Sequence, residues 1–192
     1  GCLHPPCLMP VQASVEELFG YGEVPVVSLP DLYGGKLCAA LDRQHPRDLF
    51  DVHGLLQEGG ISRAIFSGFL CYLLGHPRPM NEIMAPRWQA LEERFHKEFE
   101  GMTRVPVALD VLLRTRQAML SALQTQFTEQ DRAFLLSFKQ GEPDWDLFDH
   151  PTIAHLPAVQ WKLLNIKRLA KNKGKHGALL NKLRDVLDDW LS

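Results

Sequence analysis

Sixteen consecutive residues in the first third of this chain include five charged side chains that are candidates for binding and catalysis. They are a lysine, two arginines and two aspartates, at Lys36, Arg43, Arg47, Asp48 and Asp51. Lysine and arginine side chains bind phosphates, whereas a carboxylate can bind a metal ion or accept a proton. We therefore expect a site that holds a polyanion next to a reactive carboxylate.

The lysine of this group follows two glycines near the start of a predicted helix. Lys36, Ala40 and Arg43 are spaced by four and three residues, so they share one face of that helix. The N–H groups at a helix start and a nearby ammonium can act on one phosphate. Lys36 is therefore a candidate phosphate ligand, and a solvated lysine without a function is the alternative.

The two aspartates share one face of the next predicted helix, because Asp48 and Asp51 are three residues apart. Asp48 in the first turn would also stabilise the helix dipole. Asp51 can form an ion pair with Lys36 or Arg43 across the helix hairpin. These structural roles and a catalytic or metal-binding role all stay open at this point.

The elements that must position these residues are mostly helices. Ser28 and Asp31 form a capping box that predicts a helix to about Arg43, and a second helix is expected over 47–57. The run 24–29 is the best strand candidate, and residues 1–22 are expected to be irregular with at most a short amphipathic piece at 15–19. Further helices are predicted over 62–74, 87–99, 107–126, 129–140, 157–171 and 175–191. The expected fold is mainly α with a short β remnant.

The composition is that of an ordinary globular protein. The 192 residues are 45% hydrophobic and 23% charged, with a net charge of -2. We expect two regions, residues 1–100 and 101–192. Cys38 and Cys71 are expected to be buried. No signal peptide is recognised and the longest apolar run, 65–74, is too short to span a bilayer, so a cytoplasmic protein without membrane contact is predicted.

The C-terminal region is strongly basic. No Asp or Glu occurs between Thr152 and Arg184. The cations of this stretch are Lys162, Lys167, Arg168, Lys171, Lys173, Lys175, Lys182 and Arg184. Such a surface can bind an RNA backbone, or it can be a solvated face that balances the acidic remainder. We expect Trp161 and Leu164 to pack inside rather than to stack on bases.

The segment 24–43, together with Arg47-Asp48-Leu49-Phe50-Asp51-Val52, resembles a block of the AbiEii/AbiGii nucleotidyltransferase toxins. That block reads K…A-L-x-R…R-D-L-[YF]-D-[LV]. Residues 129–138, 141–145 and 156–165 are similar to the helical C-terminal region of the same family. The resemblance implies a truncated α+β nucleotidyltransferase-like core followed by a helical C-terminal region.

The resemblance also implies an activity. Members of this DNA polymerase β-like superfamily transfer a nucleotide from an NTP, with Mg²⁺, to an acceptor, which for some toxins is the end of tRNA. A cognate antitoxin usually accompanies them. Lys36 would then hold the triphosphate with help from Arg43 or Arg47, and Asp48 and Asp51 would orient groups or act as a base. The basic C-terminal face would contact the tRNA.

Two motifs of the family do not occur in this sequence. The Gly-Gly-[Ser/Thr] turn is absent, and no metal-binding Asp-x-Asp precedes Val24. Asp144-Trp145-Asp146 has the second spacing but is expected to form a turn. We therefore expect the rear portion of a nucleotidyltransferase, cut at its N-terminus and inactive alone, with no metal ligands of its own. The alternative is a helical module that binds RNA or an antitoxin without catalysis.

Overall fold

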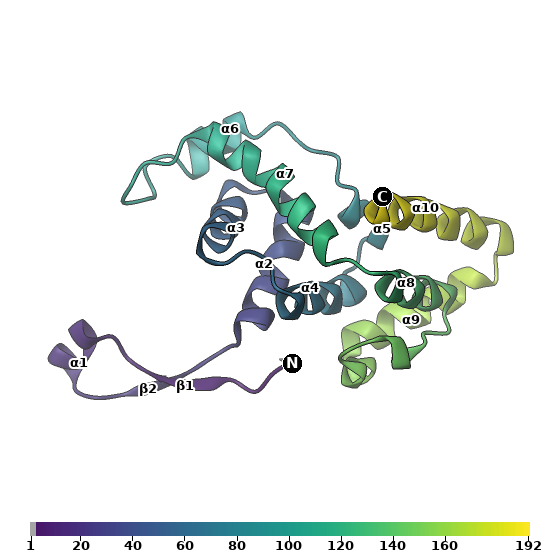
Figure 1. The fold of residues 1–192 in the computed structure, drawn as a ribbon, viewed down its shortest axis with the longest axis horizontal. Coiled ribbons are helices and arrows are strands. Elements are labelled where there is room, and N and C mark those ends of the chain that lie inside the picture. Colours follow the sequence, from purple (N-terminus) through teal and green to yellow (C-terminus); the bar gives the residue numbers. More distant parts are fainter. Residues whose placement is uncertain (1–2) are drawn as a thin grey trace.

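The computed structural model describes residues 3–192 (Figure 1). The first half contains β1 (Cys7–Pro10), α1 (Ala13–Phe19), β2 (Glu23–Val26), α2 (Leu29–Arg43), α3 (Pro46–Glu58), α4 (Arg63–Gly75), α5 (Met80–Met84) and α6 (Glu92–Glu98). The second half contains α7 (Leu109–Gln126), α8 (Glu129–Gln140), two short 3₁₀ helices, η1 (Trp145–Leu147) and η2 (Pro151–His155), α9 (Pro157–Ala170) and α10 (Lys173–Leu191). The mainly α prediction is confirmed.

The centre of the fold is the contact between α2 and α4. Leu37 and Leu41 of α2 are fully buried, as are Phe66 and Phe69 of α4. The two helices approach closely where glycines face each other. A Cβ on Gly34 would lie 2.5 Å from the carbonyl carbon of Gly68, so only glycine fits there. This approach fixes α2, and with it the face that carries Lys36.

Substituting Gly34 by alanine is therefore expected to destabilise the protein by about 1–3 kcal/mol, because the added methyl group overpacks the contact with α4. Gly54, in the interior of α3, is the matched control, since a Cβ there would meet nothing within 4 Å. Gly54→Ala should stabilise by about 0.5–1 kcal/mol through helix propensity. Urea unfolding of both variants measures the two changes, and equal effects would contradict the close approach.

Other helices surround this pair. α3 packs on α7, α4 packs on α9, and α5 packs on α10, so segments on either side of residue 100 are in contact. The division at residue 100 stays a prediction. A buried ion pair also joins distant segments. Arg63, at the start of α4, donates to both carboxylate oxygens of Asp131 of α8 at 2.6 and 2.8 Å. Asp131 also completes the predicted capping box with Thr128.

Residues 7–26 form an arm that extends away from the helical body (Figure 1). β1 and β2 pair antiparallel, with Cys7 opposite Val26, and every residue of α1 is exposed. Large apolar side chains of this arm face solvent, including Leu18 and Phe19 at 77% and 83% exposure. The prediction of an irregular 1–22 segment was wrong for Cys7–Pro10. This strand has prolines on both sides and gains its order only from pairing with β2.

Two other predictions differ from the structure. The helix expected over 87–99 begins only at Glu92, because the side chain of Gln44 holds the preceding segment extended through Arg87 O and Gln89 N. α5 was missed, since five residues between prolines carry little periodicity.

Burial of Cys38 and Cys71 is confirmed, and desolvation raises the pKa of each thiol to about 12. Within residues 3–192, no helix has both the length and the apolar character required to cross a bilayer.

Candidate functional site

Two ion pairs connect α2 and α3 and involve four of the five predicted site residues. Lys36 Nζ lies 2.5 Å from Asp51 Oδ2, and Arg43 Nη2 lies 2.7 Å from Asp48 Oδ1. The two helices are joined at Gln44 and His45, so Arg43 at the end of α2 meets Asp48 in the first turn of α3, and Lys36 in the middle of α2 meets Asp51 in the middle of α3. The ion pairing considered for Asp51 is therefore observed, and its partner is Lys36.

The two pairs differ in their accessibility. Lys36 and Asp51 are both partly open to solvent, at 32% and 38% side-chain exposure. Asp48 is largely buried, whereas its partner Arg43 is 64% exposed. Oδ2 of Asp48 is buried and has no hydrogen-bond partner within residues 3–192. Asp48 therefore orients the exposed Arg43 guanidinium through its Nη2. Lys36 and Asp51 both remain accessible to a ligand.

The fifth predicted residue lies apart from these pairs. Arg47 Nη2 donates to the backbone oxygen of Glu98 on α6 at 3.4 Å. His45, which caps α3 by accepting from Arg47 N, contacts Oε2 of Glu98 at 2.7 Å. That contact with His45 is the largest cause of a lowered pKa for the Glu98 carboxyl. Arg47 therefore contributes to the turn between α2 and α3, and the structure does not bring it to Lys36.

The residues described here do not fit a bound magnesium ion. Both carboxylates of the site already face a cation. Within residues 3–192, no cluster of three or more His, Cys, Asp or Glu side chains has a geometry that could hold a metal ion. Asp144, which shares the Asp-x-Asp spacing, accepts a hydrogen bond from Asp146 N at the start of η1, so its role as a turn residue is confirmed.

The basic C-terminal region exposes its cations along α9 and α10. Lys167, Arg168, Lys171, Lys173 and Lys175 are exposed. The expectation that Trp161 and Leu164 pack inside was wrong, because they are 61% and 42% exposed. The inward face of α9 is formed instead by residues such as Val159 and Leu163. The Arg168 guanidinium lies 5.8 Å from the centroid of the Trp161 ring, so the surface combines positive charge with an aromatic face.

Sequence reasoning missed Gln44 and the extended segment after α5. Gln44 is 3% exposed and adopts a left-handed conformation with φ of 53° at the end of α2. Its side chain joins α2 to residues 87–89, which are 43 to 45 positions away. The only sequence signal was its position at the end of a predicted helix, where a left-handed residue is common but is usually glycine.

Comparison with known proteins gives one result. The sequence family described as "Nucleotidyl transferase AbiEii toxin, Type IV TA system" matches residues 1–165. Neither a search of curated proteins nor a search of solved structures gave a match. The match covers most of the chain and includes both ion pairs between α2 and α3. The chain belongs to the AbiEii nucleotidyl transferase toxin family.

Proposed function

We propose that this chain contributes to the transfer of a nucleotide from an NTP to an RNA acceptor such as tRNA. The observation that carries the proposal is the Lys36–Asp51 contact at 2.5 Å, with the Arg43–Asp48 pair beside it. Cations that can hold phosphates and a carboxylate that can accept a proton are thus adjacent and accessible. This arrangement suits phosphoryl transfer, which depends on positioning and charge stabilisation.

In the proposed reaction, Lys36 and Arg43 bind the triphosphate of the NTP. The acceptor hydroxyl oxygen forms a bond to the α-phosphorus, and the bond from that phosphorus to the bridging oxygen of the β-phosphate breaks. Pyrophosphate leaves, and Asp51 accepts the proton of the hydroxyl. Asp48 is a positioning residue that acts through Arg43, because its side chain is largely buried. Arg47, which contacts Glu98 and not Lys36, has no role in this reaction.

The magnesium ion that the family implies would, when bound, stabilise charge on the phosphates. Its ligands would be the aspartates of the Asp-x-Asp motif that accompanies the Gly-Gly-[Ser/Thr] turn; no Asp-x-Asp precedes Val24, and that turn does not occur in residues 1–192. We therefore infer that residues 1–192 alone do not transfer nucleotides, and that activity requires these motifs to be supplied with them. As a member of a toxin family, the protein has an antitoxin as an expected partner.

Nucleotide transfer can be tested directly. A protein that combines the two motifs with residues 1–192 is incubated with Mg²⁺, total tRNA and each α-³²P-labelled NTP in turn. We expect radiolabel in the tRNA with at least one NTP, and none with residues 1–192 alone. The absence of labelled RNA with all four nucleotides would contradict the proposal.

The second candidate function is RNA binding without catalysis. It is favoured by the basic surface of α9 and α10 and by the exposed Trp161, because single-stranded RNA is bound by positive grooves with aromatic platforms. Tight, salt-dependent RNA binding in a protein that labels no RNA would support this candidate over the first. If the protein binds an antitoxin but neither binds nor labels RNA, it is a non-catalytic module for the antitoxin.

A further inference from the structure

A pocket of about 700 Å³ lies between α5, residues 85–89 and α10, next to the end of α2. Figure 1 shows α5 directly beside α10, and the two helices are in contact. The pocket is separate from the two ion pairs, since none of the five predicted site residues lines it. A volume of this size suits a nucleotide-sized ligand.

The walls of the pocket are held by specific contacts. Gln44 fixes the extended segment by donating to Arg87 O at 2.9 Å and accepting from Gln89 N at 2.8 Å. Trp190 of α10 donates its indole N–H to Met84 O at the end of α5. The pocket is therefore preformed, which reduces the entropy cost of binding a ligand.

Three cations and two carboxylates line the pocket, an excess of one positive charge. Arg78 is neutralised by Asp42 at 2.6 Å and by Glu82 at 3.3 Å. Arg87 and Lys182, by contrast, have no salt-bridge partner within residues 3–192, although Asp185 also lines the pocket. Two exposed cations thus converge on one pocket from α10 and from the segment after α5, and an anion is the expected ligand.

The remaining polar groups suit the rest of a nucleotide. Oδ1 of Asn81 is buried and has no hydrogen-bond partner within the described residues. The Gln89 side-chain amide lines the same pocket and is exposed. Amide groups can pair with base edges or with a ribose 2′-hydroxyl. The pocket therefore offers two exposed cations for a phosphate and the exposed Gln89 amide for the attached nucleoside.

We propose that this pocket binds a phosphodiester and an adjacent nucleoside near the 3′ end of the acceptor RNA. Gln44 follows Lys36 by eight residues along α2, which is about 12 Å along a helix axis. A single-stranded tail of about four nucleotides is long enough to span that distance, because even a stacked strand in a duplex advances about 3.4 Å per nucleotide. An RNA held by Arg87 and Lys182 can thus reach Lys36 with its terminal nucleotide. This inference rests on the proposed function for the identity of the RNA as an acceptor.

The test measures RNA binding without any NTP. The probe is a fluorescein-labelled RNA hairpin with a four-nucleotide single-stranded 3′ tail, titrated by anisotropy from 50 to 200 mM salt. We expect the double variant Arg87→Gln/Lys182→Gln to weaken binding about tenfold. The slope of log K against log salt should decrease by roughly 1.4, which is about 0.7 for each lost phosphate contact to a single strand. Both side chains are exposed and unpaired, so the fold is expected to persist and circular dichroism checks it.

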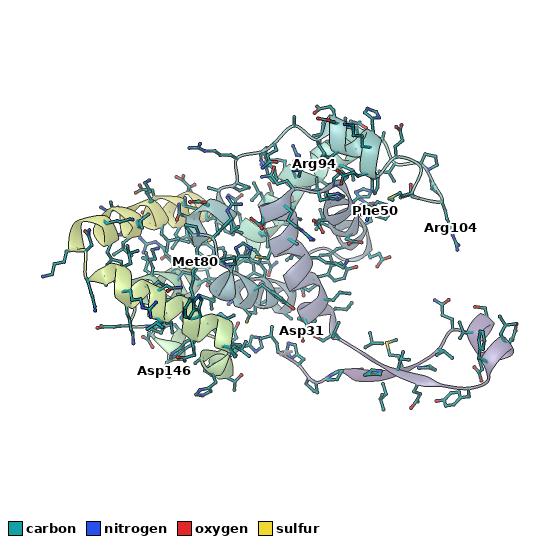
Figure 2. All side chains as sticks on the ribbon, turned by 180° about the vertical axis from the view of Figure 1, so that it is seen from behind. Asp31, Phe50, Met80, Arg94, Arg104 and Asp146 are labelled. Atoms are coloured by element: carbon teal, nitrogen blue, oxygen red, sulfur yellow. The ribbon has the colours of Figure 1, made fainter. Side chains whose placement is uncertain are left out.

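The matched control is Lys97→Gln/Arg104→Gln, which removes the same charges on the other side of the molecule. Figure 2 shows Arg104 far from Met80 at the start of α5. This control should change binding less than twofold. An equal loss in both double variants, or no loss in the first, would overturn the proposal.

Two further measurements separate the possible ligands and the two proposals. Displacement of the probe by ATP that is itself weakened by Arg87→Gln/Lys182→Gln would assign the pocket to the NTP and overturn the inference. If RNA is bound as expected but never labelled in the transfer assay, the proposed function fails while the RNA pocket stands.

Discussion

Replacing Lys36 by alanine is expected to lower kcat/KM for nucleotide transfer at least 100-fold. The variant is made in a protein that combines residues 1–192 with the Gly-Gly-[Ser/Thr] and Asp-x-Asp motifs. The reason for the loss is that Lys36 is the accessible cation nearest to a candidate base, with Nζ at 2.5 Å from Asp51. Loss of one preorganised group that stabilises transition-state charge typically costs 10²–10³ in rate. Transfer of radiolabel from α-³²P-NTP to RNA, measured over a range of NTP concentrations, gives both kcat and KM.

Stability must be separated from catalysis in this variant. Both side chains of the Lys36–Asp51 pair are about one-third exposed, and solvent weakens their attraction. Removal of the pair should therefore change the free energy of unfolding by no more than about 1 kcal/mol. Lys97→Ala is the control, since Lys97 is an exposed lysine whose partner Glu93 lies on the same helix. If Lys36→Ala keeps more than half of the wild-type rate while Lys97→Ala is also active, Lys36 does not belong to the site.

The largest effect on stability is expected for Asp131→Ala. Asp131 is fully buried and accepts hydrogen bonds from Arg63 and from both the backbone N–H and the hydroxyl of Thr128. Loss of this buried carboxylate should cost about 3 kcal/mol, because Thr128 N–H loses its acceptor while Arg63 keeps only Asp149 and Gln126 O. For a chain of this size, the melting temperature should fall by about 10 °C. Differential scanning calorimetry measures the change.

Asp110→Ala provides the comparison for this variant. Asp110 forms an ion pair with Arg114 four residues later, and both side chains are mostly exposed. Exposed pairs of this kind contribute about 0.3–0.5 kcal/mol, so the melting temperature should fall by no more than about 2 °C. Similar decreases in the two variants would show that burial of Asp131 does not strengthen its interactions.

Local signals explain which elements could be predicted. Ser28, Thr128 and their partners three residues later identified the starts of α2 and α8, and both hydroxyls accept the expected backbone hydrogen bond. These signals involve residues three apart, so they need no tertiary structure. The facing arrangement of Lys36 and Asp51 followed from the same reasoning, because a short connection between two helices brings their exposed faces together.

Long-range contacts explain what the sequence could not reveal. Gln44 determines where α6 begins by contacting Arg87 and Gln89, and no local pattern encodes that contact. β1 was missed because its four residues include neither alternation nor a buried side chain. The exposure of Trp161 was missed because hydrophobicity alone predicted burial, whereas the packing of α9 turns Val159 inward instead. Each of these features depends on residues that are far apart in the chain.

The contact between Lys36 and Asp51 has a consequence for the order of binding events. In the protein without a ligand the ammonium is already paired with Asp51, so the phosphate of the proposed reaction would compete with Asp51 for the same three donors. Binding of the phosphate and release of the carboxylate would then be a single exchange. Asp51 would become a strong acceptor only while Lys36 is occupied, and departure of the anion would restore the inert pair. A proton acceptor that is masked in the resting state in this way is available only when a nucleotide is present to be consumed.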